Sequence, residues 1–449
     1  MSELPQGWAQ TILGDIVSPR GAKALPVELG DARFIGMDHI EAHTSRLLDT
    51  QPVSGFKSAV SVFKKGDILY GRLRPYLNKV YEADFDGAAS AEFIVLPESP
   101  AVERRFLALS LRDPKFVAFA SQRSTGDRPR VKFESVSDYP ISLPPLPEQH
   151  RIVAKLDSLF ERTRRAREEL SHIPRLIENY KKAILEAAFR GDLTKDWRRT
   201  DELVQWKKLS LSELLAEPLS NGRSVPDGNG FPVLRLTALR NQILDLSERK
   251  LGNWDRSQAA RYVVKSGDFF VSRGNGSLDL VARGSYITAV DEDVAFPDTM
   301  IRIRPDLAEI RTPFLYHQWS YVGVRSQIVA MAKTTAGIYK VSQSDLNKVQ
   351  LVVPPLEEQE EIVRRIEKAL HWLNIVEMEQ GQATHLLDRL DQANLAKAFR
   401  GELVPQDPND EPAAVLLERI PADADGAARA AAVPRRKNRR NSYDCLGNR

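Results

Sequence analysis

The sequence LPPLPEQ at residues 143–149 recurs as VPPLEEQ at 353–359, and AFRGDL at 188–193 recurs as AFRGEL at 398–403. Every pairing between the two copies holds at a constant offset of 210 residues, without a gap. Loops change length easily, whereas a rod that must keep its length does not. The two copies are therefore predicted to form two equivalent rigid elements.

The interior of each copy has the spacing of a long helix. In the first copy, apolar or small residues recur in steps of four and three: Ile152, Leu156, Leu159, Thr163, Ala166, Leu170, Ile173, Ile177, Tyr180, Ile184 and Ala187. In the second copy the same register holds Ile362, Ile366, Ala369, Leu373, Val376, Gln380, Ala383, Leu387 and Leu390. This heptad seam predicts two helices of about forty residues, each about 60 Å long, that pair with each other. An ordinary amphipathic surface helix is the alternative interpretation.

One residue in the first seam opposes a regular helix. Pro174 has no N–H to donate and its ring clashes with the preceding turn. A bend or a break is therefore predicted near Ile173. Polar Gln380, Asn394 and Lys397 likewise interrupt the second seam.

The composition is that of a soluble globular protein with about three domains' worth of core. The chain has 449 residues, of which 42% are hydrophobic and 28% charged. No stretch of 18 apolar residues and no basic, apolar leader is present, so a cytoplasmic location and no membrane partner are expected. The single cysteine, Cys445, excludes an intrachain disulfide. A net charge of +3 is too small to indicate nucleic-acid binding by itself.

The repeats divide the chain into five parts. Residues 1–142 form a first globular unit, 143–193 the first helical spacer, 194–352 a connector with a second globular unit, 353–403 the second spacer, and 404–449 a C-terminal segment. In the first unit, strands are predicted around 33–37, 67–70 and 92–96, and helices around 102–111 and 114–122.

The second globular unit repeats the plan of the first with wandering offsets. Trp206–Leu214 resembles Trp8–Ile16, and Gly267-Asp268 resembles Gly66-Asp67. The globular units therefore share a plan but differ in loop length and in most side chains. From about residue 421 the tail is predicted to be disordered, and 435–440 is a basic run.

Catalytic patterns are largely missing. His39 and His43 lack the arrangement of a zinc-protease helix, and no metal site is expected. Gly274-Asn275-Gly276 has Asp279 where a dinucleotide loop needs its third glycine. Neither a phosphate-binding Gly-Lys-Ser/Thr loop nor the motif loop of the adenine methyltransferases occurs. The chain is predicted to be no enzyme and to have no catalytic residue.

Basic side chains gather instead in loops at matching places of the two units. One loop follows a strand, at 71–79 and again at 272–277, and another precedes each helical spacer, at 123–132 and 333–340. Arg and Asn can read base edges, and Lys, Arg and hydroxyl groups suit phosphates. The candidate DNA-binding residues are Arg72, Arg74, Asn78, Lys79, Arg123, Arg128, Arg130, Lys132, Arg273, Asn275, Lys333, Tyr339 and Lys340. Arg302 and Arg304 alternate with isoleucines and are expected to be solvated rather than to face DNA.

The chain resembles the specificity subunit of Type I restriction-modification enzymes. The resemblance lies in the LPPLxEQ start of each long helix, its AFRG(D/E)L end, the 194–198 connector, and the alternation of variable unit and helix. It covers residues 1 to about 420. It implies two target recognition domains, each reading one half of a split DNA sequence, and two helices that form an antiparallel coiled coil between them.

The resemblance also implies partners. Two copies of an adenine-N6 methyltransferase subunit would dock on this chain, and motor-nuclease subunits would join them. S-adenosylmethionine, ATP and magnesium would be bound by those partners, and no cofactor by this subunit. Two equivalent helices laid antiparallel would create a pseudo-two-fold axis, so that one chain could offer two similar surfaces to two copies of one partner.

The expected fold class is therefore α+β: two globular mixed α/β target recognition domains separated by two long antiparallel coiled-coil helices, in a pseudo-two-fold tandem repeat. The expected function is recognition of a bipartite, asymmetric site in double-stranded DNA within a multisubunit restriction and methylation complex. A DNA methyltransferase or nuclease with its own recognition domains, and a coiled-coil scaffold that does not bind DNA, are the alternatives.

Overall fold

The computed structural model describes residues 4–198, 206–335 and 337–419. The tail predicted to be disordered from about 421, with its basic run at 435–440 and Cys445, lies outside these residues. The chain forms two compact units: the first unit comprises 1–169 and 383–449, and the second unit comprises 170–382. Each unit therefore contains one globular part, a portion of one long helix and a portion of the other.

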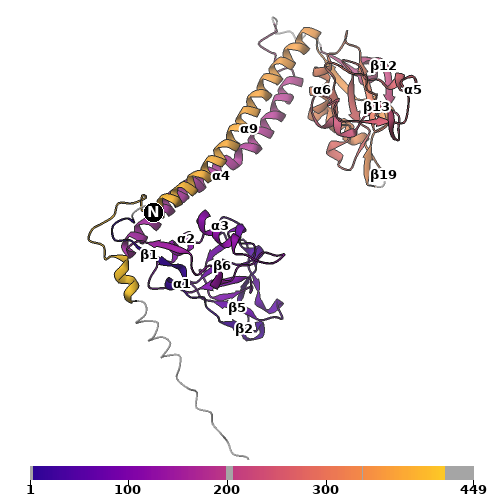
Figure 1. Cartoon of the computed structure of the whole chain (residues 1–449). Coiled ribbons are helices and arrows are strands. Elements are labelled where there is room, and N and C mark those ends of the chain that lie inside the picture. Colours follow the sequence, from indigo (N-terminus) through magenta and orange to yellow (C-terminus); the bar gives the residue numbers. More distant parts are fainter. Residues whose placement is uncertain (1–3, 199–205, 336, 420–449) are drawn as a thin grey trace, which may run out of the picture. The chain divides into compact units, whose positions relative to one another are not determined.

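In the first unit, the globular part is built from two sheets and the short helices packed against them (Figure 1). A five-stranded sheet has the order β2-β5-β8-β3-β4, with Lys23–Ala24, Val60–Phe63, Gly87–Ala89, Arg33–Ile35 and Gln51–Pro52. A three-stranded sheet has the order β7-β6-β9, with Val80–Glu82, Ile68–Gly71 and Phe93–Leu96. The helices are α1 Leu13–Ile16, α2 Arg104–Ser110 and α3 Pro114–Gln122. The strands and the two longer helices predicted for this part are confirmed.

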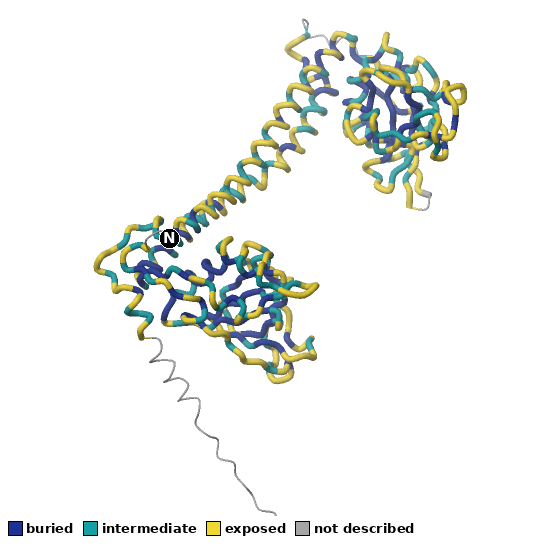
Figure 2. Tube along the Cα trace, in the orientation of Figure 1, coloured by how far each residue is buried: buried dark blue, intermediate teal, exposed yellow. Residues whose placement is uncertain are grey.

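In the second unit, a four-stranded sheet has the order β12-β18-β15-β17, with Leu215–Asn221, Met300–Pro305, Phe269–Ser272 and Gly284–Tyr286. Smaller sheets contain β13 Asp227–Leu234 with β14 Arg249–Gly252, and β16 Gly274–Asn275 with β20 Ile338–Lys340 and β19 Lys333–Thr335. The helices are α5 Arg256–Ala259, α6 Thr312–Ser320, α7 Val322–Met331 and α8 Gln343–Leu346. Buried residues concentrate in these sheets and against α6 (Figure 2).

A two-stranded antiparallel pair leads into each long helix. Strand β1, Ala9–Ile12, pairs with β10, Pro140–Leu143, and in the second unit β11, Lys207–Ser210, pairs with β21, Gln350–Val353. A proline pair follows β10 and β21, and each long helix begins at the residue directly after it. Proline restricts the residue before it to extended backbone, so the strand ends at the proline pair and the helix cannot begin earlier. The same local arrangement of strand and proline pair thus precedes both long helices.

The rods are α4, Leu146–Phe189, and α9, Leu356–Ala398, which lie side by side (Figure 1). Within the first unit, Thr163 Oγ1 donates to Asp391 at 2.9 Å, and Arg167 pairs with Asp388 at 3.0 Å. Since residue numbers rise along α4 while those of their partners fall along α9, the helices run antiparallel there. The predicted pairing of the two helices is confirmed.

Two residues placed on the seam by the sequence are in fact exposed. The exposed fraction of Tyr180 is 58% and that of Leu390 is 47%. The next seam positions, Ile184 and Asn394, are half-buried and buried, so the seam continues beyond both residues. Because Tyr180 and Leu390 are separated by the repeat offset, the same position is lost from both seams.

Helix α4 passes through Pro174 without a break, so the break predicted as one of two outcomes near Ile173 does not occur. Pro174 is exposed, so its ring lies on the outer side of the helix. The carbonyl that it leaves without an intrahelical donor is that of Leu170, four residues earlier. Gln380 Nε2 of α9 donates to this carbonyl at 3.5 Å. A polar residue that interrupts the second seam thereby compensates a proline that interrupts the first.

We expect Pro174→Ala to stabilise the chain by up to about 3 kcal/mol, because alanine restores the bond to the Leu170 carbonyl and removes the ring from the helix interior. Gln380→Ala should then cost less stability in the Pro174→Ala variant than in the parent chain. A double-mutant cycle in denaturant unfolding, followed by far-UV circular dichroism, measures this coupling. Equal costs of Gln380→Ala in both backgrounds would contradict the compensation.

Candidate nucleic-acid interface

The two basic loops predicted in the first unit come together at one end of the β7-β6-β9 sheet. Arg72 directly follows β6, and its carbonyl accepts from Val131 N at 3.0 Å. Arg74 N donates to the Pro129 carbonyl at 2.7 Å, and Leu73 forms a β-bridge with Arg130. Residues 72–79 and 123–132, far apart in sequence, therefore form one surface.

The second unit repeats this arrangement. Arg273 follows β15, and its carbonyl accepts from Val341 N at 3.1 Å. Strand β16 pairs with β20, so that Gly274 lies opposite Lys340 and Asn275 opposite Tyr339. The loop after a central strand and the loop before the long helix thus meet in both units. Their meeting in both halves is the main geometric support for a shared binding role.

The candidate residues of the first unit differ in their exposure to solvent and in whether their polar groups have hydrogen-bond partners. Arg74, Arg128 and Lys132 are exposed, and Arg72 is half-buried. Within the described residues, the buried Nε of Arg72 has no hydrogen-bond partner. Tyr76, which the prediction passed over, is 50% exposed in the same loop as Arg72 and Arg74. These residues present donors and an aromatic ring at the surface.

Two other candidates have structural roles. Asn78 adopts a left-handed backbone conformation with φ of 47°, and its Nδ2 donates to the Arg112 carbonyl at 3.2 Å. Lys79 Nζ donates to the Met37 carbonyl at 2.6 Å, and burial lowers the pKa of Lys79 from its usual value. Both side chains hold the loop in place from inside the protein.

Arg123 and Arg130 are engaged in ion pairs. Arg123 stacks on Phe119, with the guanidinium carbon 3.5 Å from the ring centre, and pairs with Asp138 at 3.0 Å. Arg130 forms a forked ion pair with Glu92, with distances of 2.7–3.0 Å. The hydrogen bonds from Arg130 hold the pKa of Glu92 below its usual range, and the charges of Arg72 and Arg128 lower it further. Glu92 therefore lies among several of the candidate arginines.

In the second unit, Arg273, Lys333 and Lys340 are exposed, whereas Asn275 and Tyr339 are half-buried. Asn275 Oδ1 accepts from Ser277 N at 3.0 Å, which orders the turn after β16. This surface is basic like that of the first unit, but its side chains differ in type and in order.

The expectation that Arg302 and Arg304 are solvated is wrong. Arg302 is buried and pairs with Glu217 at 2.9 Å, and Arg304 pairs with Asp268 at 2.6 Å. Asp67 of the first unit, which corresponds to Asp268, is also buried but pairs with Arg20 from the N-terminal part. A buried carboxylate requires a paired cation, and each unit supplies it from a different segment. These arginines are structural.

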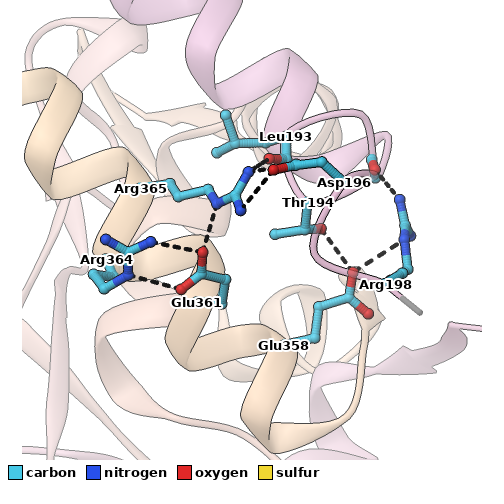
Figure 3. Close-up of polar contacts among 9 residues, drawn as sticks. Leu193, Thr194, Asp196, Arg198, Glu358, Glu361, Arg364 and Arg365 are labelled. Atoms are coloured by element: carbon cyan, nitrogen blue, oxygen red, sulfur yellow. Dashed lines mark hydrogen bonds and ion pairs between the residues drawn. The ribbon is translucent and has the colours of Figure 1, made fainter.

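The repeated Glu-Gln pair at the start of each long helix forms a buried polar cluster. In the second unit, Glu358 accepts from Trp206 Nε1 at 3.0 Å. It also accepts from Thr194 Oγ1 at 2.7 Å, and a guanidinium nitrogen of Arg198 lies 3.3 Å from its carboxylate (Figure 3). Arg198 also donates to the Gly191 carbonyl. The start of α9 thus holds the connector that follows α4.

The first unit contains the corresponding cluster. Glu148 accepts from Trp8 Nε1 at 3.1 Å and from Gln406 Nε2 at 3.2 Å, and Gln406 also donates to the Gly401 carbonyl. Burial raises the pKa of Glu148 from its usual value, while these two donors oppose that shift. Gln406 therefore takes the place that Arg198 has in the second unit. Sequence reasoning missed both clusters, although the repeated Glu-Gln pair signalled them.

Neither unit offers a metal site within its described residues. No group of three or more His, Cys, Asp or Glu side chains is placed to hold an ion there. His39 Nδ1 accepts instead from Gly36 N at 3.1 Å. Among the helices that the structure describes, none is long and apolar enough to cross a membrane.

Comparison with known proteins agrees with the repeat. The family model described as Type I restriction modification DNA specificity domain matches residues 6–174 and again 204–383. The specificity subunit of the Type I restriction enzyme EcoKI from Escherichia coli K12 is 31% identical over 315 residues, which cover 67% of this chain and 66% of that protein. The StySPI specificity subunit from Salmonella potsdam is 32% identical over 295 residues, 63% of each protein. The matched part thus spans slightly less than two thirds of these relatives.

Solved structures share the fold. A chain from a structure titled as the basis of complex assembly and conformational transition of the type I R-M system has a TM-score of 0.69 and 23% identity, and the match covers 90% of this chain and 100% of that one. The HsdS subunit from Thermoanaerobacter tengcongensis has a TM-score of 0.62 and 23% identity, with 89% and 98% covered. Because the family model matches well over half of the sequence, in two successive copies, this chain belongs to the family of Type I restriction-modification specificity subunits.

Proposed function

We propose that this chain is the DNA-recognition subunit of a Type I restriction-modification complex and that its two globular parts each read one half of a split target. The observation that carries this proposal is the two-loop basic surface, which recurs at the same place in both units with different side chains. A surface with a common backbone plan and different side chains suits two readers of different base sequences. The target is accordingly asymmetric.

The chemistry of the exposed groups supports double-stranded DNA as the ligand. The first surface presents Arg74, Arg128 and Lys132, and the second presents Arg273, Lys333 and Lys340. Arginine can bind guanine edges in the major groove through two hydrogen bonds, and lysine suits phosphates as a point charge. We propose no catalytic residue and no cofactor for this chain, so that S-adenosylmethionine, ATP and magnesium belong to partner subunits.

The long helices would serve as a spacer between the two readers. We propose that α4 and α9 form an antiparallel coiled coil with a pseudo-two-fold axis, and that the domain limits are 1–142, 143–193, 194–352, 353–403 and 404–449. The constant offset between the copies, together with the antiparallel contacts of α4 and α9, supports this arrangement. Two helices of nearly equal length, 44 and 43 residues, would hold the half-sites at a fixed separation.

Matched apolar positions on the helices support the docking of two copies of one partner. Leu176 and Tyr180 of α4 are 53% and 58% exposed, and their counterparts Leu386 and Leu390 of α9 are 59% and 47% exposed. Exposed apolar pairs that recur at equivalent positions suit a repeated partner contact. We propose that the methyltransferase subunits bind here and that motor-nuclease subunits complete the complex.

The first experiment is co-expression with the methyltransferase subunit and mapping of N6-methyladenine across the host DNA. We expect one asymmetric motif in two parts with a fixed gap. Arg74→Ala with Arg128→Ala should weaken or relax recognition in one half of the motif, because those side chains lie on one surface only. Arg273→Ala with Lys340→Ala should affect the other half.

The control for this map is Arg256→Ala, which removes an exposed arginine that pairs with Asp293 away from the two loops. It should leave the motif unchanged. An intact motif in both double variants would contradict the assignment of the surfaces. A stable complex that methylates nothing would favour the alternative function, a coiled-coil scaffold without DNA contact.

A second prediction concerns stoichiometry. Leu176→Glu should remove one methyltransferase copy from the complex, Leu386→Glu the other, and the double variant both, since a charge opposes burial of each apolar pair. Native mass spectrometry of the co-purified complex counts the copies. Leu48→Glu is the matched control, because Leu48 is 52% exposed but lies off the helices. Two bound copies in the double variant would show that the partner docks elsewhere.

A further inference from the structure

Glu92 is an acidic residue at the centre of a surface that should attract DNA. It directly precedes β9, and the register of the sheet places Gly71 of β6 opposite Phe93 of β9. Its carbonyl accepts from Arg72 N at 2.9 Å. The carboxylate is therefore fixed at the end of the sheet where the two basic loops meet.

This carboxylate forms an ion pair with one of the candidate arginines, Arg130. Both Nε and Nη2 of Arg130 donate to Glu92, at 3.0 Å and 2.7 Å. A forked pair of this kind uses the donors with which arginine would otherwise bind a phosphate. Arg74 and Arg128 remain exposed in the same two loops. Glu92 thus removes one phosphate-binding group from the surface without removing the arginine.

The second unit shows that the fold does not require an acid at this place. Arg273 N donates to the Thr299 carbonyl at 2.8 Å, the same contact that Arg72 N makes with Glu92. Thr299 therefore stands in the position of Glu92 and carries no charge. The backbone arrangement forms equally well around a neutral side chain, so the carboxylate in the first unit calls for a different explanation.

We propose that Glu92 is a specificity-determining residue of the first recognition surface, which keeps Arg130 from binding phosphates and so limits attraction to DNA that lacks the target. This inference rests on the proposed function. Attraction to phosphates acts on every sequence, whereas contacts to base edges favour one. A residue that weakens only the attraction to phosphates therefore raises the ratio of target to non-target affinity.

The test uses the complex with the methyltransferase subunit and two fluorescent duplexes, one with the mapped motif and one without it. We expect Glu92→Gln, and Glu92→Thr, which copies the second unit, to raise affinity for the duplex without the motif severalfold. The slope of log affinity against log salt should steepen by about 0.9 for that duplex, the value for one further phosphate contact. The preference for the motif should fall in proportion.

Two controls separate this effect from a general change of charge or structure. Glu92→Gln with Arg130→Gln should return the salt slope to that of the parent complex, because the freed arginine is then absent. Glu402→Gln removes a carboxylate from an exposed ion pair with Arg400 and should change neither affinity nor slope. Thermal unfolding confirms that each variant is folded.

The outcomes distinguish the inference from the function on which it rests. Suppose that the parent complex prefers the motif but that Glu92→Gln and Glu92→Thr leave the salt slope and the non-target affinity unchanged, or weaken binding to both duplexes. The role of Glu92 is then overturned, and the proposed function stands. If the parent complex binds neither duplex, the proposed function itself fails.

Discussion

A buried carboxylate at the start of each long helix is the constraint on which the rest of the structure depends. The exposed fraction of Glu148 is 1% and that of Glu358 is 2%. Removing such an ion from water costs several kcal/mol unless hydrogen bonds replace the water, and here an indole N–H and a group from the segment after the other helix do so. A residue inserted into only one helix would move one end out of reach of its carboxylate, whereas insertions in the globular parts strain neither cluster. This double attachment explains why the helices keep a constant offset while the basic loops of the two globular parts differ in length.

Much of this architecture could be predicted from the sequence, because it follows from local patterns and from repetition. The two long helices, the strands before the basic loops and the pairing of the helices all follow from spacing alone. Tyr180 and Leu390 were placed on the seam by spacing alone, although both are exposed, because spacing does not show which apolar side chains the neighbouring helix covers. A break at Pro174 was offered as one outcome and does not occur, and the hydrogen bond from Gln380 to the freed carbonyl comes from a residue 206 positions away in the sequence.

The position of the candidate site could be predicted from the sequence, but which of its basic side chains are paired with carboxylates could not. The sequence identifies the loops, since their basic residues recur, but it does not show which cations are already neutralised. Arg130 and Arg123 have carboxylate partners, whereas Arg74 and Arg128 remain exposed, and no local pattern distinguishes the two kinds. Likewise the strand at 300–305 alternates in a way that suggests exposed arginines, yet its arginines neutralise Glu217 and the buried Asp268.

The net positive charge of each surface therefore depends on which arginines form ion pairs with carboxylates distant in sequence, rather than on the number of basic residues. In a chain with 64 basic and 61 acidic residues, a few exposed arginines would determine where phosphates are attracted under the proposed function. If each arginine had a carboxylate neighbour, these loops would bind DNA only weakly. If none had one, the loops would bind every DNA sequence about equally well. A partly neutralised surface at the end of a sheet would meet both requirements of the proposed function, because base contacts would then have to supply the affinity that phosphate attraction alone does not.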